Sequence, residues 1–86
     1  MSDYNVQFVA SAAKEFRALP TDIKRRVGVA VEILRKNPRS ADAHKLRAHE
    51  RLYRIRVGHY RVVYEIDDQS RIIRITRVRH RREVYR

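Results

Sequence analysis

The sequence predicts a single α+β domain in which two N-terminal helices pack on one face of a small antiparallel sheet, in the order β-α-α-β-β-β. Three observations predict it: an apolar helical stripe in the first half, two-residue alternation of apolar and polar side chains in the second half, and a length of 86 residues. A chain this short supports one thin core, so we expect one domain over residues 1–86. That length excludes a dinucleotide-binding fold or a barrel enzyme.

The first half of the chain is typical of one strand followed by two helices. Residues 4–8 alternate apolar with polar side chains, which predicts a half-buried strand. We expect Ser11 to cap a short helix and the break at Pro20 to begin a longer one. The longer helix carries a continuous apolar stripe made of Ile23, Val27, Ala30, Val31 and Leu34. Asn37-Pro38 ends it, because proline disfavours helical geometry in the residue before it.

Residues 39–50 are polar and predict a loop, after which apolar and polar residues alternate as far as residue 78. Gly58-His59 has the length and the glycine of a two-residue hairpin turn. Residues 67–70 supply a second turn. From residue 79 onward we expect a short basic tail.

The turn at Gly58-His59 decides which residues face each other across the hairpin. With these two residues as the loop, Arg56 lies opposite Arg61 and the large apolar pairs share the other face of the sheet. A one-residue slip would turn the arginines into the core, where unpaired charges are costly. We therefore expect Arg54, Arg56 and Arg61 to lie together on a solvent-facing side of the sheet.

The charge of the chain points to an anionic partner. The formal net charge is +11, and residues 44–86 carry +8 of it through 12 Arg and one Lys against five acidic residues. Like charges opposite one another destabilise a free sheet, so a face of arginines is best explained by an anion that it binds. Arginine outnumbers lysine by 17 to 4, which favours bidentate recognition of phosphate. We infer that the partner is nucleic acid.

The residue types give little support to other chemistries. The chain has no cysteine, which excludes disulfides and thiolate chemistry and fits a reducing compartment. Its four histidines lack the spacing of metal ligands, and no glycine-rich phosphate loop or Ser/His/Asp set can be recognised. We expect no metal, no cofactor, no membrane contact and a cytoplasmic location.

Two segments of the C-terminal half are distinctive: YRIRVGHYRVVYEI over residues 53–66 and VRHRREVY over residues 78–85. With shorter similarities at residues 19–20, 37–38 and 45–46, they resemble the RelE family of toxin-antitoxin systems across nearly the whole chain. The resemblance implies a RelE-like fold and a toxin that cleaves messenger RNA in the decoding site of the ribosome. It also implies a partner, a cognate antitoxin, in which we expect an acidic segment.

The resemblance also implies site residues. The catalytic set carried over by position consists of Arg54, Arg56, Arg61, Arg81 and Tyr85. We expect further RNA contacts from the basic residues around it, namely Lys45, Arg47, Arg74, Arg79 and Arg82.

Cleavage of this kind, without a metal, is an in-line attack of a ribose 2′-OH on the adjacent phosphate. It needs a proton acceptor, stabilisation of the phosphorane charge and a proton donor for the leaving oxygen. The best-known family member has lysines where this chain has Arg54 and Arg56, and arginine does not lose its proton in proteins. Tyr85, Glu83, His80 or a ribosomal group could be the base, and the sequence leaves this choice open.

Two other functions fit the same sequence. A ParE-like gyrase inhibitor shares the architecture but blocks a protein target, and the presence of Arg61, Arg81 and Tyr85 argues against it. A non-catalytic RNA-binding domain would show salt-dependent binding and no cleavage product.

Overall fold

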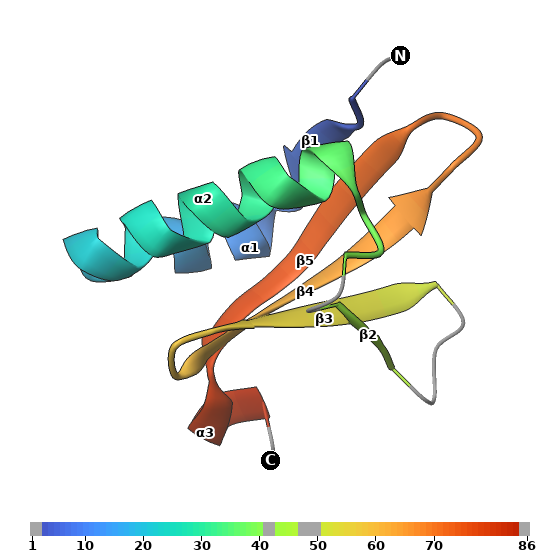
Figure 1. Ribbon diagram of the computed structural model, residues 1–86. Coiled ribbons are helices and arrows are strands. Elements are labelled where there is room, and N and C mark those ends of the chain that lie inside the picture. The colour runs from blue at the N-terminus through green and yellow to red at the C-terminus, as the bar shows by residue number, and fades with distance from the viewer. Residues whose placement is uncertain (1–2, 41–42, 47–50, 85–86) are drawn as a thin grey trace.

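The computed structural model describes residues 3–40, 43–46 and 51–84, so Arg47 and Tyr85, both expected site residues, lie outside the described residues. Its elements are β1 (Asn5–Phe8), α1 (Ala10–Arg17), α2 (Thr21–Lys36), β2 (His44–Lys45), β3 (Leu52–Val57), β4 (Tyr60–Asp67), β5 (Ile72–His80) and α3 (Arg81–Val84). Helices α1 and α2 lie on the same side of the sheet, as the sequence predicts (Figure 1). None of the described helices is long and apolar enough to cross a membrane.

The strands form one mixed sheet in the order β1-β5-β4-β3-β2. Four strands pair antiparallel, but β1 pairs parallel with β5, from Asn5 opposite Ile72 to Phe8 opposite Ile75. The expectation of an antiparallel sheet is therefore wrong at this edge. Both helices and three strands separate β1 from β5 in the chain, and a long connection of this kind permits parallel pairing.

Three boundaries differ from the sequence prediction. Residues 39–50, expected to be loop, include the two-residue strand β2, which pairs with β3. Helix α1 begins at Ala10 with no side-chain cap, so Ser11 lies inside the helix, because β1 runs almost directly into it. β5 continues through Arg79 and His80, which pair with β4, so the expected basic tail begins as strand and helix α3.

The hairpin of β3 and β4 has the register that the sequence predicts. Arg56 lies opposite Arg61, and the apolar pairs that flank them follow as expected. Gly58 has a φ of 60°, in the left-handed region where glycine is unstrained and which two-residue hairpin turns require. The turn thus fixes which side chains lie on each face of the sheet.

The core fills the space between the helices and the sheet. Its fully or almost fully buried members are Ala12, Leu19, Val27, Val31, Leu34, Ile55, Val57, Val62, Tyr64, Ile66, Ile73, Ile75 and Val78. Tyr64 is the largest of them, and its hydroxyl donates a hydrogen bond to the carbonyl oxygen of Pro38 at 2.8 Å. Burial raises the pKa of Tyr64. This bond satisfies a buried hydroxyl and attaches the segment after α2 to the sheet.

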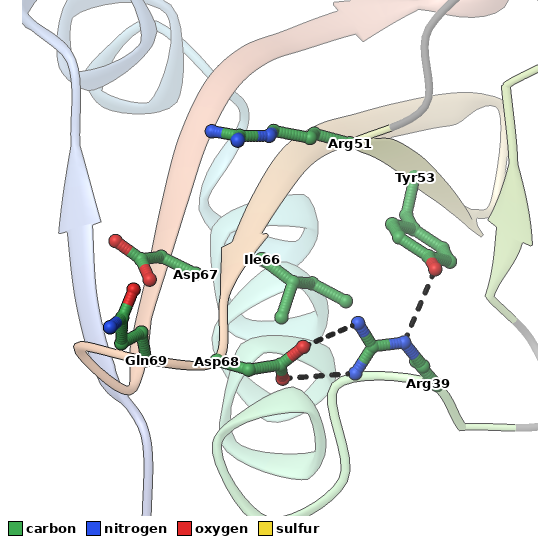
Figure 2. A pocket seen from close by; sticks show the side chains of 7 residues that line it. All are labelled: Arg39, Arg51, Tyr53, Ile66, Asp67, Asp68 and Gln69. Atoms are coloured by element: carbon green, nitrogen blue, oxygen red, sulfur yellow. Dashed lines mark hydrogen bonds and ion pairs between the residues drawn. The ribbon is translucent and has the colours of Figure 1, made fainter.

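A polar cluster around Asp68 connects Tyr4, just before β1, with the segment after α2, β3 and the turn after β4. The Arg39 guanidinium donates two hydrogen bonds to the Asp68 carboxylate, at 2.9 and 3.1 Å, and a third to the Tyr53 hydroxyl at 3.2 Å (Figure 2). The Tyr4 hydroxyl donates to the same carboxylate at 2.6 Å. These donors, Arg39 first, lower the pKa of Asp68 to about 2. The cluster borders a cavity of about 390 Å³.

The Asp68 cluster predicts a specific acid dependence of stability. The folded-state pKa of about 2 lies below the ordinary value of 3.8, so the ionised carboxylate stabilises the fold above pH 4 and this contribution is lost as pH falls toward 2. We expect Asp68→Asn to lower the melting temperature at pH 6, by an amount that shrinks between pH 4 and pH 2. Asp3→Asn, at an exposed carboxylate, is the control. A difference that stays constant down to pH 2 would contradict this role of Asp68.

Candidate nucleic-acid interface

The side of the sheet away from the helices carries four arginines that act on one another. Arg54 and Arg56 come from β3, Arg61 comes from β4, and Arg81 begins α3 at the point where β5 ends. The residues between the strand arginines are buried in the core, so the alternation of a strand turns the arginines the other way. The other three guanidinium groups all lower the pKa of Arg61. We call these four residues the arginine cluster.

Arg61 is enclosed, although the sequence predicts a solvent-facing position. It is 5% exposed, whereas Arg54 is half-buried and Arg56 is exposed. The expectation of an open face is wrong at Arg61 because β4 is the middle strand, so side chains of β3 and β5 flank it on both sides. Burial first, and then the charges of Arg54, Arg56 and Arg81, lower the pKa of Arg61. The cluster therefore contains one largely buried arginine close to three other arginines.

A β-bulge decides which basic residues of β5 join this face. The register between β4 and β5 shifts between Val63 and Tyr64, and beyond the shift Arg79 lies directly opposite Arg61. Thr76 lies at the bulge, where its hydroxyl donates a hydrogen bond to the carbonyl oxygen of Val63 at 3.2 Å. The extra residue reverses the alternation along β5. Arg79 consequently lies on the same face as the arginine cluster.

Glu15 of α1 holds the C-terminal part of β5 in place. Its carboxylate accepts the Val78 backbone N–H at 2.8 Å and the Arg79 Nε at 2.6 Å. The pairing of β1 with β5 ends at Ile75, so beyond this residue the carboxylate replaces a neighbouring strand. Arg79, expected to contact RNA, is therefore anchored by an ion pair with α1.

The other expected RNA contacts occupy different settings. Arg74 forms a cross-strand ion pair with Glu65 at 3.1 Å. Lys45 is exposed on β2 at the far edge of the sheet, and Arg82 is exposed on α3. The structure thus brings Arg82 near the arginine cluster through α3 and places Lys45 at the margin of the sheet.

Two histidines that the sequence does not pair meet at the end of the hairpin. The rings of His59 and His80 lie 6.1 Å apart between centroids and, with Arg81 and Arg82, line a hollow of about 790 Å³. The Arg81 N–H donates to the His59 carbonyl oxygen at 2.7 Å, and the Arg82 N–H donates to His80 Nδ1 at 3.3 Å. The first bond holds α3 against the hairpin turn, and the second joins α3 to the end of β5. Within the described ranges, no group of three or more His, Cys, Asp or Glu could hold a metal ion.

The chain is similar to known proteins over nearly its whole length. The family model described as ParE toxin of type II toxin-antitoxin system, parDE, matches residues 6–85. Toxin RelE3 of Methanocaldococcus jannaschii is 31% identical over 84 residues, which are 93% of each chain.

Solved structures show the same relationship. A chain of the RelE-RelB complex from Pyrococcus horikoshii OT3 is 30% identical with a TM-score of 0.81, covering 92% of this chain and 96% of that one. The isolated E. coli RelE toxin is 28% identical with a TM-score of 0.83, covering 95% of this chain and 90% of that one.

The fold and the comparisons together define a toxin of a type II toxin-antitoxin system. The chain belongs to the RelE family within the RelE/ParE superfamily. The resemblance noted in the two C-terminal segments is thereby confirmed.

The enclosed position of Arg61 predicts opposite effects of two substitutions on stability. Arg61→Met keeps most of the side-chain volume and removes a charge that burial and three cations disfavour, so we expect an equal or higher urea midpoint. Arg61→Ala also removes the buried aliphatic stem, and we expect a loss of about 1–3 kcal/mol. A large loss for Arg61→Met would show that the charge itself supports the fold, and equal midpoints for the two variants would show that the buried stem contributes nothing.

Proposed function

We propose that the protein is a cytoplasmic, ribosome-dependent endoribonuclease that cleaves messenger RNA and is held inactive by a cognate antitoxin. The arginine cluster is the observation that supports this proposal. Arg61 is desolvated among Arg54, Arg56 and Arg81, an arrangement that burdens the free protein and favours a bound polyanion. A phosphate group in contact with these residues would relieve their mutual repulsion.

The proposed reaction is a metal-independent attack of a ribose 2′-OH on the neighbouring phosphorus. The bond from phosphorus to the 5′ oxygen of the next nucleotide breaks, leaving a 2′,3′-cyclic phosphate and a 5′-OH. Arg54, Arg56, Arg61 and Arg81 would stabilise the negative charge that grows on the non-bridging oxygens. Because Arg61 is buried, its interaction with this charge is weakly screened by water. Tyr85 completes the proposed catalytic set.

The proton acceptor must be a group other than the arginines of the cluster. His80 is a described candidate, because its ring lies beside Arg81 at the end of β5. Glu83, Tyr85 and a ribosomal group are the others. Each would act only once the ribosome has placed the RNA, so the free toxin needs no complete catalytic set of its own.

The remaining basic residues would guide the RNA backbone. We propose contacts from Lys45, Arg47, Arg74, Arg79 and Arg82. Arg74 and Arg79 are already held by Glu65 and Glu15, so they would present ordered, partly neutralised groups to the phosphates. Lys45 and Arg82 are exposed and would contribute mainly to salt-dependent affinity.

The solved relatives support the proposed antitoxin partner. Complexes of RelE with RelB are known from Pyrococcus horikoshii OT3, Mycobacterium tuberculosis and E. coli. For this chain we propose an antitoxin with an acidic segment that pairs with the basic face and excludes RNA from it.

The match to the ParE toxin model favours one alternative function, inhibition of DNA gyrase. The two functions separate in paired assays: supercoiling by purified gyrase, and cleavage of a message on translating ribosomes. Inhibited supercoiling together with an intact message would contradict our proposal and show that the protein is a gyrase inhibitor. RNA binding without either effect would indicate a non-catalytic domain.

Primer extension on a message bound to programmed ribosomes tests the proposal directly. We expect cuts with the wild-type protein, none on free RNA, and at least a hundredfold slower cleavage by Arg61→Met, because it removes a charge that contacts the transition state. Arg35→Met, at a half-buried arginine of α2 that pairs with Glu32 and donates to the Tyr4 carbonyl oxygen, is the matched control and should cleave normally. Efficient cutting of free RNA, or full activity of Arg61→Met, would contradict the proposal.

The arginines of β3 make a further prediction about pH. If Arg54 and Arg56 act only as fixed charges, Arg54→Lys and Arg56→Lys should keep much of the activity, with some loss of bidentate geometry. Their single-turnover rates should then follow the wild-type pH profile. A rate that rises log-linearly with pH in a lysine variant alone would place the general base on β3, because a lysine beside other cations can lose its proton where arginine cannot.

A further inference from the structure

Helix α2 exposes apolar side chains on a face that the core does not use. Its core-facing residues are Val27, Val31 and Leu34. Val29 is 60% exposed and Ile33 is 53% exposed. Their spacing of four residues places them on one face of the helix. Two large apolar side chains presented together to solvent indicate a contact surface.

This strip forms one wall of a groove of about 410 Å³ between α2 and the hairpin. Val57 and Gly58 at the hairpin turn form the opposite wall. The Arg26 guanidinium closes over the turn, since its Nη1 would lie 3.1 Å from a Cβ atom placed on Gly58. Glycine at this position therefore serves both the turn and the close approach of Arg26.

The rim of the groove is cationic. Arg25, Arg26 and Arg56 line it together with the apolar residues. No carboxylate among the described residues forms an ion pair with any of these three arginines. A groove with apolar walls and a positive rim is complementary to an amphipathic helix whose apolar face is flanked by Asp or Glu.

We propose that this groove binds an amphipathic, acid-flanked helix of the antitoxin, an inference that rests on the proposed function. Its apolar side chains would pack on Val29 and Ile33, and its carboxylates would pair with Arg25 and Arg26. A second copy of this chain is a poor occupant, because it would bring the same cations and a net charge of +11 to the interface. RNA is also a poor occupant, because it would leave the apolar walls of the groove without a contact.

Arg56 links the groove to the arginine cluster. It lines the groove and also lowers the pKa of Arg61, so it belongs to both surfaces. A carboxylate paired with Arg56 would reduce the positive potential at Arg61. The helix would thus weaken phosphate binding even without covering the cluster.

Site-specific photocrosslinking in the toxin-antitoxin complex tests this inference. The toxin is produced together with the antitoxin encoded beside its gene, with benzoylphenylalanine in place of Val29 or Ile33. We expect both positions to crosslink to one antitoxin helix that contains Asp or Glu. The control is Arg17, which is exposed on α1 and does not line the groove, so it should crosslink weakly or not at all.

The outcomes separate the two proposals. Failure of the complex to form would overturn the proposed function and this inference with it. A complex whose crosslinks are absent at residues 29 and 33, equally strong at residue 17, or made to a second copy of the chain would overturn the groove assignment alone.

Charge reversal provides an independent measurement on the same complex. We expect Arg25→Glu combined with Arg26→Glu to weaken antitoxin binding about tenfold at low salt, and less at high salt, because the lost attraction is electrostatic. Lys14→Glu combined with Arg17→Glu, an equal change of charge at two exposed residues of α1 that do not line the groove, should change affinity less than twofold. Equal losses at both sites would indicate only a general effect of net charge and would overturn the role of the rim.

Discussion

Arg56 and Arg61 face each other across β3 and β4, and the apolar alternation that forces these like charges together also positions the rest of the basic face. The glycine turn and the buried alternate residues of both strands fix the register. A slip by one residue would relieve the repulsion only by burying arginines beneath the helices. The hairpin therefore keeps an unfavourable electrostatic contact because the apolar face leaves no alternative.

The acidic residues near this face pair with arginines of β5 and leave the positive charge of the arginine cluster in place. Glu15 and Glu65 pair with Arg79 and Arg74 on β5, whereas no described acidic residue forms an ion pair with Arg54, Arg56 or Arg81. A bound anion would therefore stabilise most the part of the sheet around the buried Arg61. An RNA phosphate and an antitoxin carboxylate would both provide such an anion. In the proposed toxin the same group of arginines would therefore bind the substrate and the inhibitor.

Much of this arrangement follows from local sequence pattern. The period of two and Gly58 sufficed to predict the hairpin register, because one face had to be apolar. Parallel pairing of β1 and the bulge at Thr76 depend on contacts distant in sequence, and a two-residue strand such as β2 is too short to show a period. The enclosure of Arg61 was missed for a related reason: alternation tells which way a side chain points, but burial depends on what the adjacent strands place beside it.

The central claim is that Arg56 and Arg61 repel each other in the free protein. A double-mutant cycle of unfolding free energies with Arg56→Met, Arg61→Met and the double variant, at 20 and 500 mM salt, measures this term alone. We expect a repulsive coupling of about 0.5–1 kcal/mol at low salt, so that the double variant gains less than the sum of the two single gains, and a smaller coupling at high salt. An attractive coupling, or none at low salt, would contradict the account.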